Sequence, residues 1–220
     1  MEYKFIPYAI PELSESEQAK KAADFNAFMS KRRTVRTFSD KPVSKEVIEN
    51  ILMAASSAPS GANKQPWHFC AISSSKIKKE IRIAAEKEEY LSYTERMSDE
   101  WKADLEKLRT NWEKPFLEKA PWLIVVFMQN YEILEHKKKL NYYVKESVGL
   151  ATGMLLAAAF NAGLASLTYT PSPMRFLGEI LGRPRNEKPY LLVPLGFPEK
   201  DTTVPDIERK GAEDVITYYS

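Results

Sequence analysis

The segment Trp122–Gln129 is a run of bulky apolar residues that directly follows Pro121. Such a run is typical of a strand buried on both faces, because a half-exposed strand would alternate apolar and polar residues. Helical patterns flank it without the regular order of a doubly wound sheet, and no Gly-x-Gly-x-x-Gly motif follows a strand. The chain is therefore expected to form an α+β sandwich, a central mixed sheet with helices on both faces.

Apolar spacing predicts the other elements of this sandwich. The expected helices are Leu13–Met29, a helix capped by Ser44, two helices or a helical lid within residues 74–111, Tyr142–Ala162 and Met174–Leu181. The other expected strands are His68–Ser73, Leu164–Thr170 and Pro189–Phe197. Lys137–Lys139 is expected in a solvated turn, and the tail after Pro198 as an extended arm. Small residues make Tyr142–Ala162 narrow, which fits either a dimer seam or close packing within one subunit.

Composition narrows the class of protein. With 220 residues, 44% hydrophobic and 28% charged, the chain is expected to be a soluble single domain, and a net charge of +2 gives no reason to expect nucleic acid or a membrane as partner. Cys70 is the single cysteine, so no intramolecular disulfide can form. Val148–Phe160 is too short to span a bilayer, and the N-terminus has no signal region, so a cytoplasmic location is expected. His68 and His136 belong to no metal-like cluster, and no metal is expected.

Two motifs suggest an anion and a flat ring as ligands. The run Arg32-Arg33-Thr34-Val35-Arg36 offers guanidiniums that match phosphate oxygens, while Val35 is expected to face the core. The loop around Pro59-Ser60-Gly61 allows a backbone to approach a flat ligand closely. Either motif alone is more often a solvated helix end or an ordinary loop. Together they indicate two halves of one flavin pocket.

At this spacing, the two motifs and the C-terminal features resemble the nitroreductase-like FMN proteins and, among them, the iodotyrosine deiodinases. The resemblance covers about Arg32 to Lys210. It implies an intertwined homodimer in which the C-terminal arm embraces the partner and FMN lies at the subunit interface. The expected division is a helical extension at residues 1–30, an FMN-binding domain at 31–197 with a lid at about 86–115, and an arm at 198–220.

The resemblance also assigns cofactor-binding residues. The segment Arg32, Arg33, Thr34, Val35 and Arg36 would hold the FMN phosphate and ribityl chain together with Arg209, and Pro59, Ser60 and Gly61 would border the isoalloxazine. Thr168, Tyr169 and Thr170 would lie along its other edge. The Thr170 hydroxyl would act catalytically beside flavin N5, where it can donate or accept a hydrogen bond. Tyr169 is bulkier than the small polar residue expected there, so the role of its side chain stays open.

A carboxylate, a phenol and an ammonium separate a deiodinase from an ordinary nitroreductase. Glu89 and Tyr93 are spaced i, i+4 and project from one helix face, and Lys114 follows in the next segment. The resemblance implies that these three grip the zwitterion of a halotyrosine, whose phenolate would accept from the backbone N–H of Ala62 and from an FMN hydroxyl. Without the resemblance, they would be ordinary surface charges of a charged helix.

The expected function is FMN-dependent reductive dehalogenation of halotyrosines, giving tyrosine and iodide, with bromo- and chlorotyrosine as further substrates. Electrons would come from an external donor, such as an NAD(P)H-linked reductase or a flavodoxin- or ferredoxin-like protein. Two alternatives stay open. One is a generic NAD(P)H-dependent nitroreductase or quinone reductase, and the other is a non-catalytic protein that binds aromatic amino acids.

Overall fold

The computed structural model describes residues 4–219. The chain divides into two compact units, the first ending at Arg32 and the second beginning at Arg33. The first unit contains helix α1 (Glu15–Ser30), which has no buried residue. Its start is fixed by a capping box, since the Ser14 hydroxyl accepts from the N–H of Glu17 and the Glu17 carboxylate accepts from the N–H of Ser14. The predicted N-terminal helix is thus confirmed.

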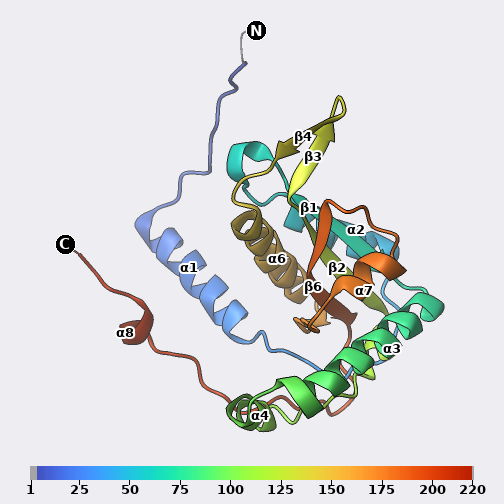
Figure 1. Ribbon diagram of the computed structural model, residues 1–220. Helices are drawn as coiled ribbons and strands as arrows, with labels where there is room; N and C mark the ends of the chain where they lie inside the picture. Colours follow the sequence, from blue (N-terminus) through green and yellow to red (C-terminus); the bar gives the residue numbers. More distant parts are fainter. Residues whose placement is uncertain (1–3, 220) are drawn as a thin grey trace. The chain divides into compact units, whose positions relative to one another are not determined.

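The second unit is built on a four-stranded sheet (Figure 1). In spatial order its strands are β1 (Trp67–Ile72), β2 (Trp122–Gln129), β6 (Glu187–Gly196) and β5 (Ala165–Ser166). All neighbouring pairs of these strands are antiparallel. A parallel bridge between Thr34 and Ser166 extends the β5 edge, so the sheet is mixed as predicted.

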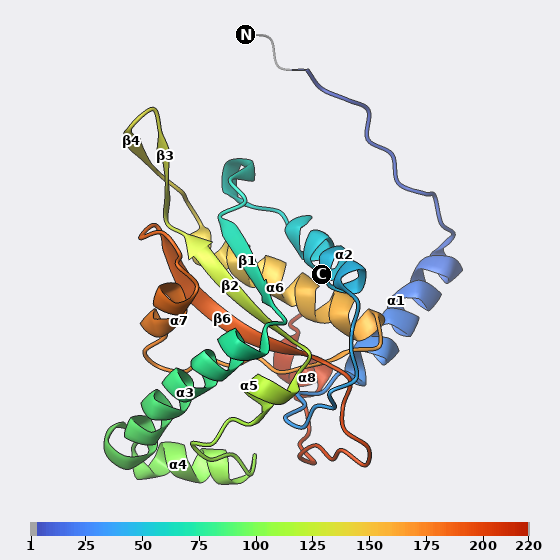
Figure 2. The same ribbon diagram turned by 90° about the vertical axis from the view of Figure 1, so that its right-hand side faces the viewer.

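Helices cover both faces of the sheet (Figure 2). One face packs against α2 (Lys45–Ser56) and α6 (Val144–Asn161), and the other against α3 (Ser75–Leu91), α5 (Phe116–Lys119) and α7 (Arg175–Ile180). Side chains of β2 alternate between the two cores, with Leu123, Val125 and Phe127 in one and Ile124 and Val126 in the other. The apolar run of β2 is therefore explained by burial on both faces, which confirms the α+β sandwich.

The charged segment between β1 and β2 forms α3 and two further elements. After α3 come a π-helical turn, η2 (Ser92–Arg96), and α4 (Asp99–Glu106). This agrees with the prediction of two helices or a lid within residues 74–111. A short 3-10 helix, η1 (Gly61–Asn63), precedes β1.

Three sequence predictions need correction. Lys137–Lys139 is not a turn but lies in β4 (Lys137–Leu140), which pairs with β3 (Tyr131–Leu134) in an exposed hairpin. Because every residue of β4 is exposed, no alternation of apolar and polar residues marked it as a strand. The expected strand Leu164–Thr170 is regular only at β5, followed by one bridge from Tyr169 to Leu192. The tail contains a short helix, α8 (Ala212–Val215), where only an extended arm was expected.

Candidate functional site

The chain folds so that Glu89, Tyr93 and Lys114 meet. Glu89 is buried near the end of α3, and Lys114, only 3% exposed, immediately precedes Pro115 and α5. The Lys114 Nζ lies 3.1 Å from Glu89 Oε2, and 5.5 Å from the centre of the Tyr93 ring. Glu89 and Tyr93 lie four residues apart on one helical segment, whereas Lys114 comes 25 residues after Glu89. The fold therefore brings Lys114 to the other two.

These residues line a cavity of about 240 Å³ beside the sheet edge. Thr168 and Thr170 are exposed, whereas Tyr169 between them is buried, as expected of an extended backbone. The full lining is Arg36, Glu89, Tyr93, Met97, Trp101, Leu105, Thr110, Lys114, Phe116 and Leu167–Thr170. The structure thus brings the expected zwitterion-binding residues together with the segment expected along the flavin edge.

Burial shapes the electrostatics of this cavity. Desolvation lowers the pKa of Lys114, and the Glu89 carboxylate opposes that shift. Desolvation also raises the pKa of Tyr93, against a hydrogen bond with Thr110 that lowers it. Charges here interact in a low-dielectric surrounding, so each is costly unless it is paired. A ligand that carries both a cation and an anion can pair with Glu89 and Lys114 at once, which an uncharged aromatic cannot do.

A second cavity, of about 520 Å³, adjoins the arginine motif. Its lining is Thr34, Arg36, Thr37, Lys107, Leu108, Arg109, Thr203, Val204, Pro205 and Asp206. Arg36 lines both cavities, and Arg33 donates through Nη2 to the carbonyl oxygen of Pro205. Cationic and hydroxyl donors outnumber the single carboxylate in this lining, a donor set that suits a phosphate group. A phosphorylated cofactor such as FMN therefore fits the residues present.

The other residues of the arginine motif differ in their surroundings. Val35 is buried, as expected, and its N–H donates to the Ser166 carbonyl at 3.1 Å, which fixes the motif against the sheet edge. Arg32 ends the first compact unit, and Arg209 is exposed in the tail. Their contacts with a phosphate stay predictions, as do the cofactor contacts of the other residues.

The loop Pro59–Ala62 lies away from both cavities. It comes just before β1, at the end of the sheet where Trp67 pairs with Met128, whereas Lys114 precedes the opposite end of β2. Figure 1 and Figure 2 show the short teal helix η1 and α4 at opposite ends of the sheet. Consequently, one chain does not bring the two expected halves of the flavin pocket together.

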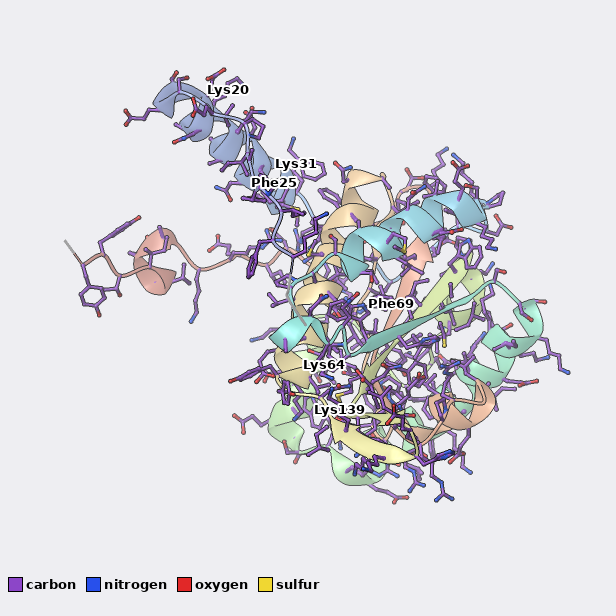
Figure 3. All side chains as sticks on the ribbon, turned by 90° about the horizontal axis from the view of Figure 1, so that it is seen from above. Lys20, Phe25, Lys31, Lys64, Phe69 and Lys139 are labelled. Carbon is purple, nitrogen blue, oxygen red and sulfur yellow. The ribbon has the colours of Figure 1, made fainter. Side chains whose placement is uncertain are left out.

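The conformation of this loop depends on its glycine. A Cβ at Gly61 would approach the Tyr143 ring to 2.8 Å, so glycine allows this close contact. Ala62 has a left-handed backbone with φ of 50°, which costs a non-glycine residue about 1–2 kcal/mol. Lys64, labelled beside Lys139 of β4 in Figure 3, ties the loop to the hairpin through an ion pair with Glu132.

Several residues that line the two cavities were not predicted from the sequence. Trp101 and Leu105 project from α4 at i, i+4 spacing, and this pairing was the available signal for a lid face. Lys107 and Arg109 line the phosphate-like cavity but follow α4 in a strongly charged stretch, where no pattern distinguishes them from solvated charges. Phe116 follows Pro115, and its burial depends on the tertiary fold.

Comparison with known proteins agrees with this geometry. The chain matches the nitroreductase family over residues 29–197. An iodotyrosine deiodinase from Haliscomenobacter hydrossis is 55% identical over 216 residues, which cover 98% of this chain and 97% of that protein. The chain belongs to the iodotyrosine deiodinases of this family. Iodotyrosine deiodinase 1 from Homo sapiens is 42% identical over 215 residues, covering 96% of this chain and 74% of the human protein.

A solved structure supports the same family. The crystal structure of oxidized iodotyrosine deiodinase bound to FMN and 3-iodo-L-tyrosine superimposes with a TM-score of 0.78 at 33% identity, covering 89% of this chain and 98% of that one. Within residues 4–219, no helix of this deiodinase-family chain is long and apolar enough to cross a membrane. Over the same described range, no cluster of three His, Cys, Asp or Glu side chains could hold a metal ion.

Proposed function

We propose that this protein is an FMN-dependent iodotyrosine deiodinase, which reductively removes iodide from mono- and diiodotyrosine, and bromide or chloride from the corresponding halotyrosines. The observation that carries the proposal is the buried pair of Glu89 and Lys114 in a cavity that shares Arg36 with a phosphate-like site. A generic nitroreductase needs no such pair, because its substrates lack an amino-acid zwitterion. Membership of the deiodinase family agrees with this assignment.

Binding of the substrate exchanges one ion pair for two. The substrate ammonium takes the position of the Lys114 ammonium beside Glu89, and Lys114 then meets the substrate carboxylate. Tyr93, a phenol whose pKa is raised by burial, remains a neutral hydrogen-bond donor next to them. The residues around 86–115 act as a lid, since seven of the thirteen residues that line the cavity, from Glu89 to Lys114, belong to this segment. Closure of this lid would exclude water from the reacting bond.

Reductive deiodination replaces a carbon–iodine bond by a carbon–hydrogen bond and needs two electrons and one proton. FMN supplies the electrons when it is bound and reduced. The residues Arg32, Arg33, Thr34 and Arg36, with Arg209, hold its phosphate and ribityl chain. Thr170 offers a hydroxyl that can donate to or accept from the flavin edge, because its exposed side chain is directed away from the buried Tyr169.

The complete site needs a second copy of the chain. Pro59, Ser60, Gly61 and Ala62 lie at the opposite end of the sheet from the cavity, and a partner subunit can present them to the flavin and to the phenolate. Helix α6 offers a surface for such a partner, since Leu150 and Met154 are exposed apolar residues and Gly153 has open space beside it. The tail from residue 198 to 220 is the arm that would embrace the partner. We also propose that residues 1–30, of which 1–3 lie outside the described part of the chain, are an extension of the FMN-binding domain at 31–197, with α1 as its helix.

We further propose that the protein works in the cytoplasm with an external donor, either an NAD(P)H-linked reductase or a flavodoxin- or ferredoxin-like protein. The test of the proposed activity is iodide release from diiodotyrosine by the purified protein with dithionite as reductant. Release of iodide together with tyrosine is the expected result. Rapid direct oxidation of NAD(P)H with nitroaromatics, and no iodide release, would favour the nitroreductase alternative. A colourless protein that binds iodotyrosine would favour a non-catalytic binding protein.

A further inference from the structure

The Tyr169 side chain contacts the carboxylate that is expected to bind the substrate ammonium. Its hydroxyl donates to Glu89 Oε1 over 3.1 Å, while Lys114 Nζ lies 3.1 Å from the other oxygen, Oε2. The two oxygens of Glu89 therefore have different partners, one a neutral hydroxyl and one an ammonium. The contact joins residues that are 80 positions apart in the sequence.

The structure holds this hydroxyl in place from two sides. The N–H of Tyr169 donates to the Leu192 carbonyl at 2.9 Å, and its own carbonyl accepts from Leu192 at 3.0 Å. Its ring packs edge-on against Phe116, with the ring centres 5.5 Å apart. Since the backbone is paired in the sheet and the residue is only 9% exposed, the hydroxyl has little freedom to leave Glu89.

We propose that Tyr169 is a positioning residue that sets selectivity for amino-acid substrates by holding Glu89 in place while Lys114 changes partner. The inference rests on the proposed function, in which the substrate ammonium displaces Lys114 from Glu89. In this exchange the partner of Glu89 Oε2 changes, while the bond from the Tyr169 hydroxyl to Oε1 is kept and continues to orient the carboxylate. A pre-oriented carboxylate binds the incoming ammonium without having to be ordered first.

The chemistry of Tyr169 suits this role. Burial, and then the Glu89 charge, raise the pKa of the Tyr169 phenol well above its ordinary value, so it stays a neutral donor. A carboxylate, by contrast, accepts hydrogen bonds only. The hydroxyl therefore holds the Glu89 carboxylate in place without competing for the substrate ammonium.

The test is Tyr169→Phe, which removes the hydroxyl and keeps the ring against Phe116. Tyr190→Phe is the matched control, because Tyr190 is a partly buried tyrosine of β6 that packs in the core on the other side of the sheet. Affinities for diiodotyrosine, and for a diiodophenol that lacks the amino-acid part, are measured by quenching of flavin fluorescence. Tyr169→Phe is expected to weaken the binding of diiodotyrosine about tenfold and to leave the binding of diiodophenol and FMN unchanged. The control Tyr190→Phe is expected to change the affinity for neither diiodotyrosine nor diiodophenol.

If Tyr169→Phe weakened the binding of diiodotyrosine and diiodophenol equally, or weakened neither, the proposal would be overturned and Tyr169 would be a packing residue only. A double-mutant cycle with Glu89→Ala adds a second criterion, since Tyr169→Phe should have no further effect once the carboxylate is gone. An undiminished effect in the Glu89→Ala background would show that the hydroxyl acts elsewhere, and would also contradict the proposal. A parent protein that releases no iodide from diiodotyrosine would instead refute the proposed function, so the two failures are distinguishable.

Discussion

Neutralising Glu89 probes the zwitterion site with a minimal change of shape. Glu89→Gln keeps an acceptor for the Tyr169 hydroxyl but removes the negative charge that faces Lys114 at 3.1 Å. Both partners of that ion pair are buried, so solvent screens their interaction weakly. The variant should therefore lose attraction for a substrate ammonium while the cavity keeps its size.

The size of the effect follows from the exchange of a charged contact for a neutral one. Hydrogen bonds to charged groups contribute about 1.5–3 kcal/mol and neutral ones about 1 kcal/mol. The difference corresponds to roughly a tenfold loss of affinity for diiodotyrosine. Lys114 also loses its counter-charge, although Thr110 and the Asn111 carbonyl still accept hydrogen bonds from its ammonium. We therefore expect a destabilisation of about 1–3 kcal/mol in urea unfolding.

Quenching of flavin fluorescence measures the affinity for diiodotyrosine and the affinity for diiodophenol in the same assay. Diiodophenol, which has no ammonium, should bind the parent and Glu89→Gln equally well. The control is Glu80→Gln, an exposed glutamate on the same helix, which should leave both ligands and the stability unchanged. An equal loss of affinity for diiodotyrosine and diiodophenol in Glu89→Gln would refute the zwitterion reasoning.

Three further changes test other parts of the site. Arg36→Ala should weaken FMN binding about tenfold or more, because Arg36 lines the phosphate-like cavity, and full FMN retention through gel filtration would contradict this. Thr170→Ala should slow iodide release while FMN content is preserved; an unchanged rate would make Thr170 only a surface residue of the sheet edge. Because the pKa of Tyr169 is raised, the folded protein keeps this proton above about pH 10 while the unfolded chain releases it. Urea unfolding should thus show the parent losing stability relative to Tyr169→Phe as pH rises above about 10, and parallel curves would contradict the shift.

Local patterns predicted the elements that are specified locally. Ser44 caps α2 as expected, and β2 spans the predicted residues Trp122–Gln129, because capping chemistry and burial on both faces leave clear marks in a sequence. The exposed strand β4 left no such mark. Polar exposed strands show no alternation, so pairing with β3 could be seen only in the fold.

Some features of the candidate site were likewise visible in the sequence, and others were not. The i, i+4 spacing of Glu89 and Tyr93 was visible in the sequence, and the family resemblance added Lys114. The contact between Tyr169 and Glu89 was not visible, since it depends on how the edge of the sheet meets the end of α3. The position of Pro59–Ala62, at the end of the sheet opposite the cavity, was not visible either. It depends on the order and direction of the strands, which the spacing of residues does not indicate.

Single-turnover stoichiometry tests the central claim most directly. The protein is reduced anaerobically until each FMN holds two electrons, excess reductant is removed, and 3-iodotyrosine is added in excess. Since each carbon–iodine bond consumes two electrons and one proton, the account predicts about one iodide and one tyrosine per FMN as the flavin returns to its oxidised form. Oxidation of the flavin without iodide, or iodide without an equal amount of tyrosine, would contradict it.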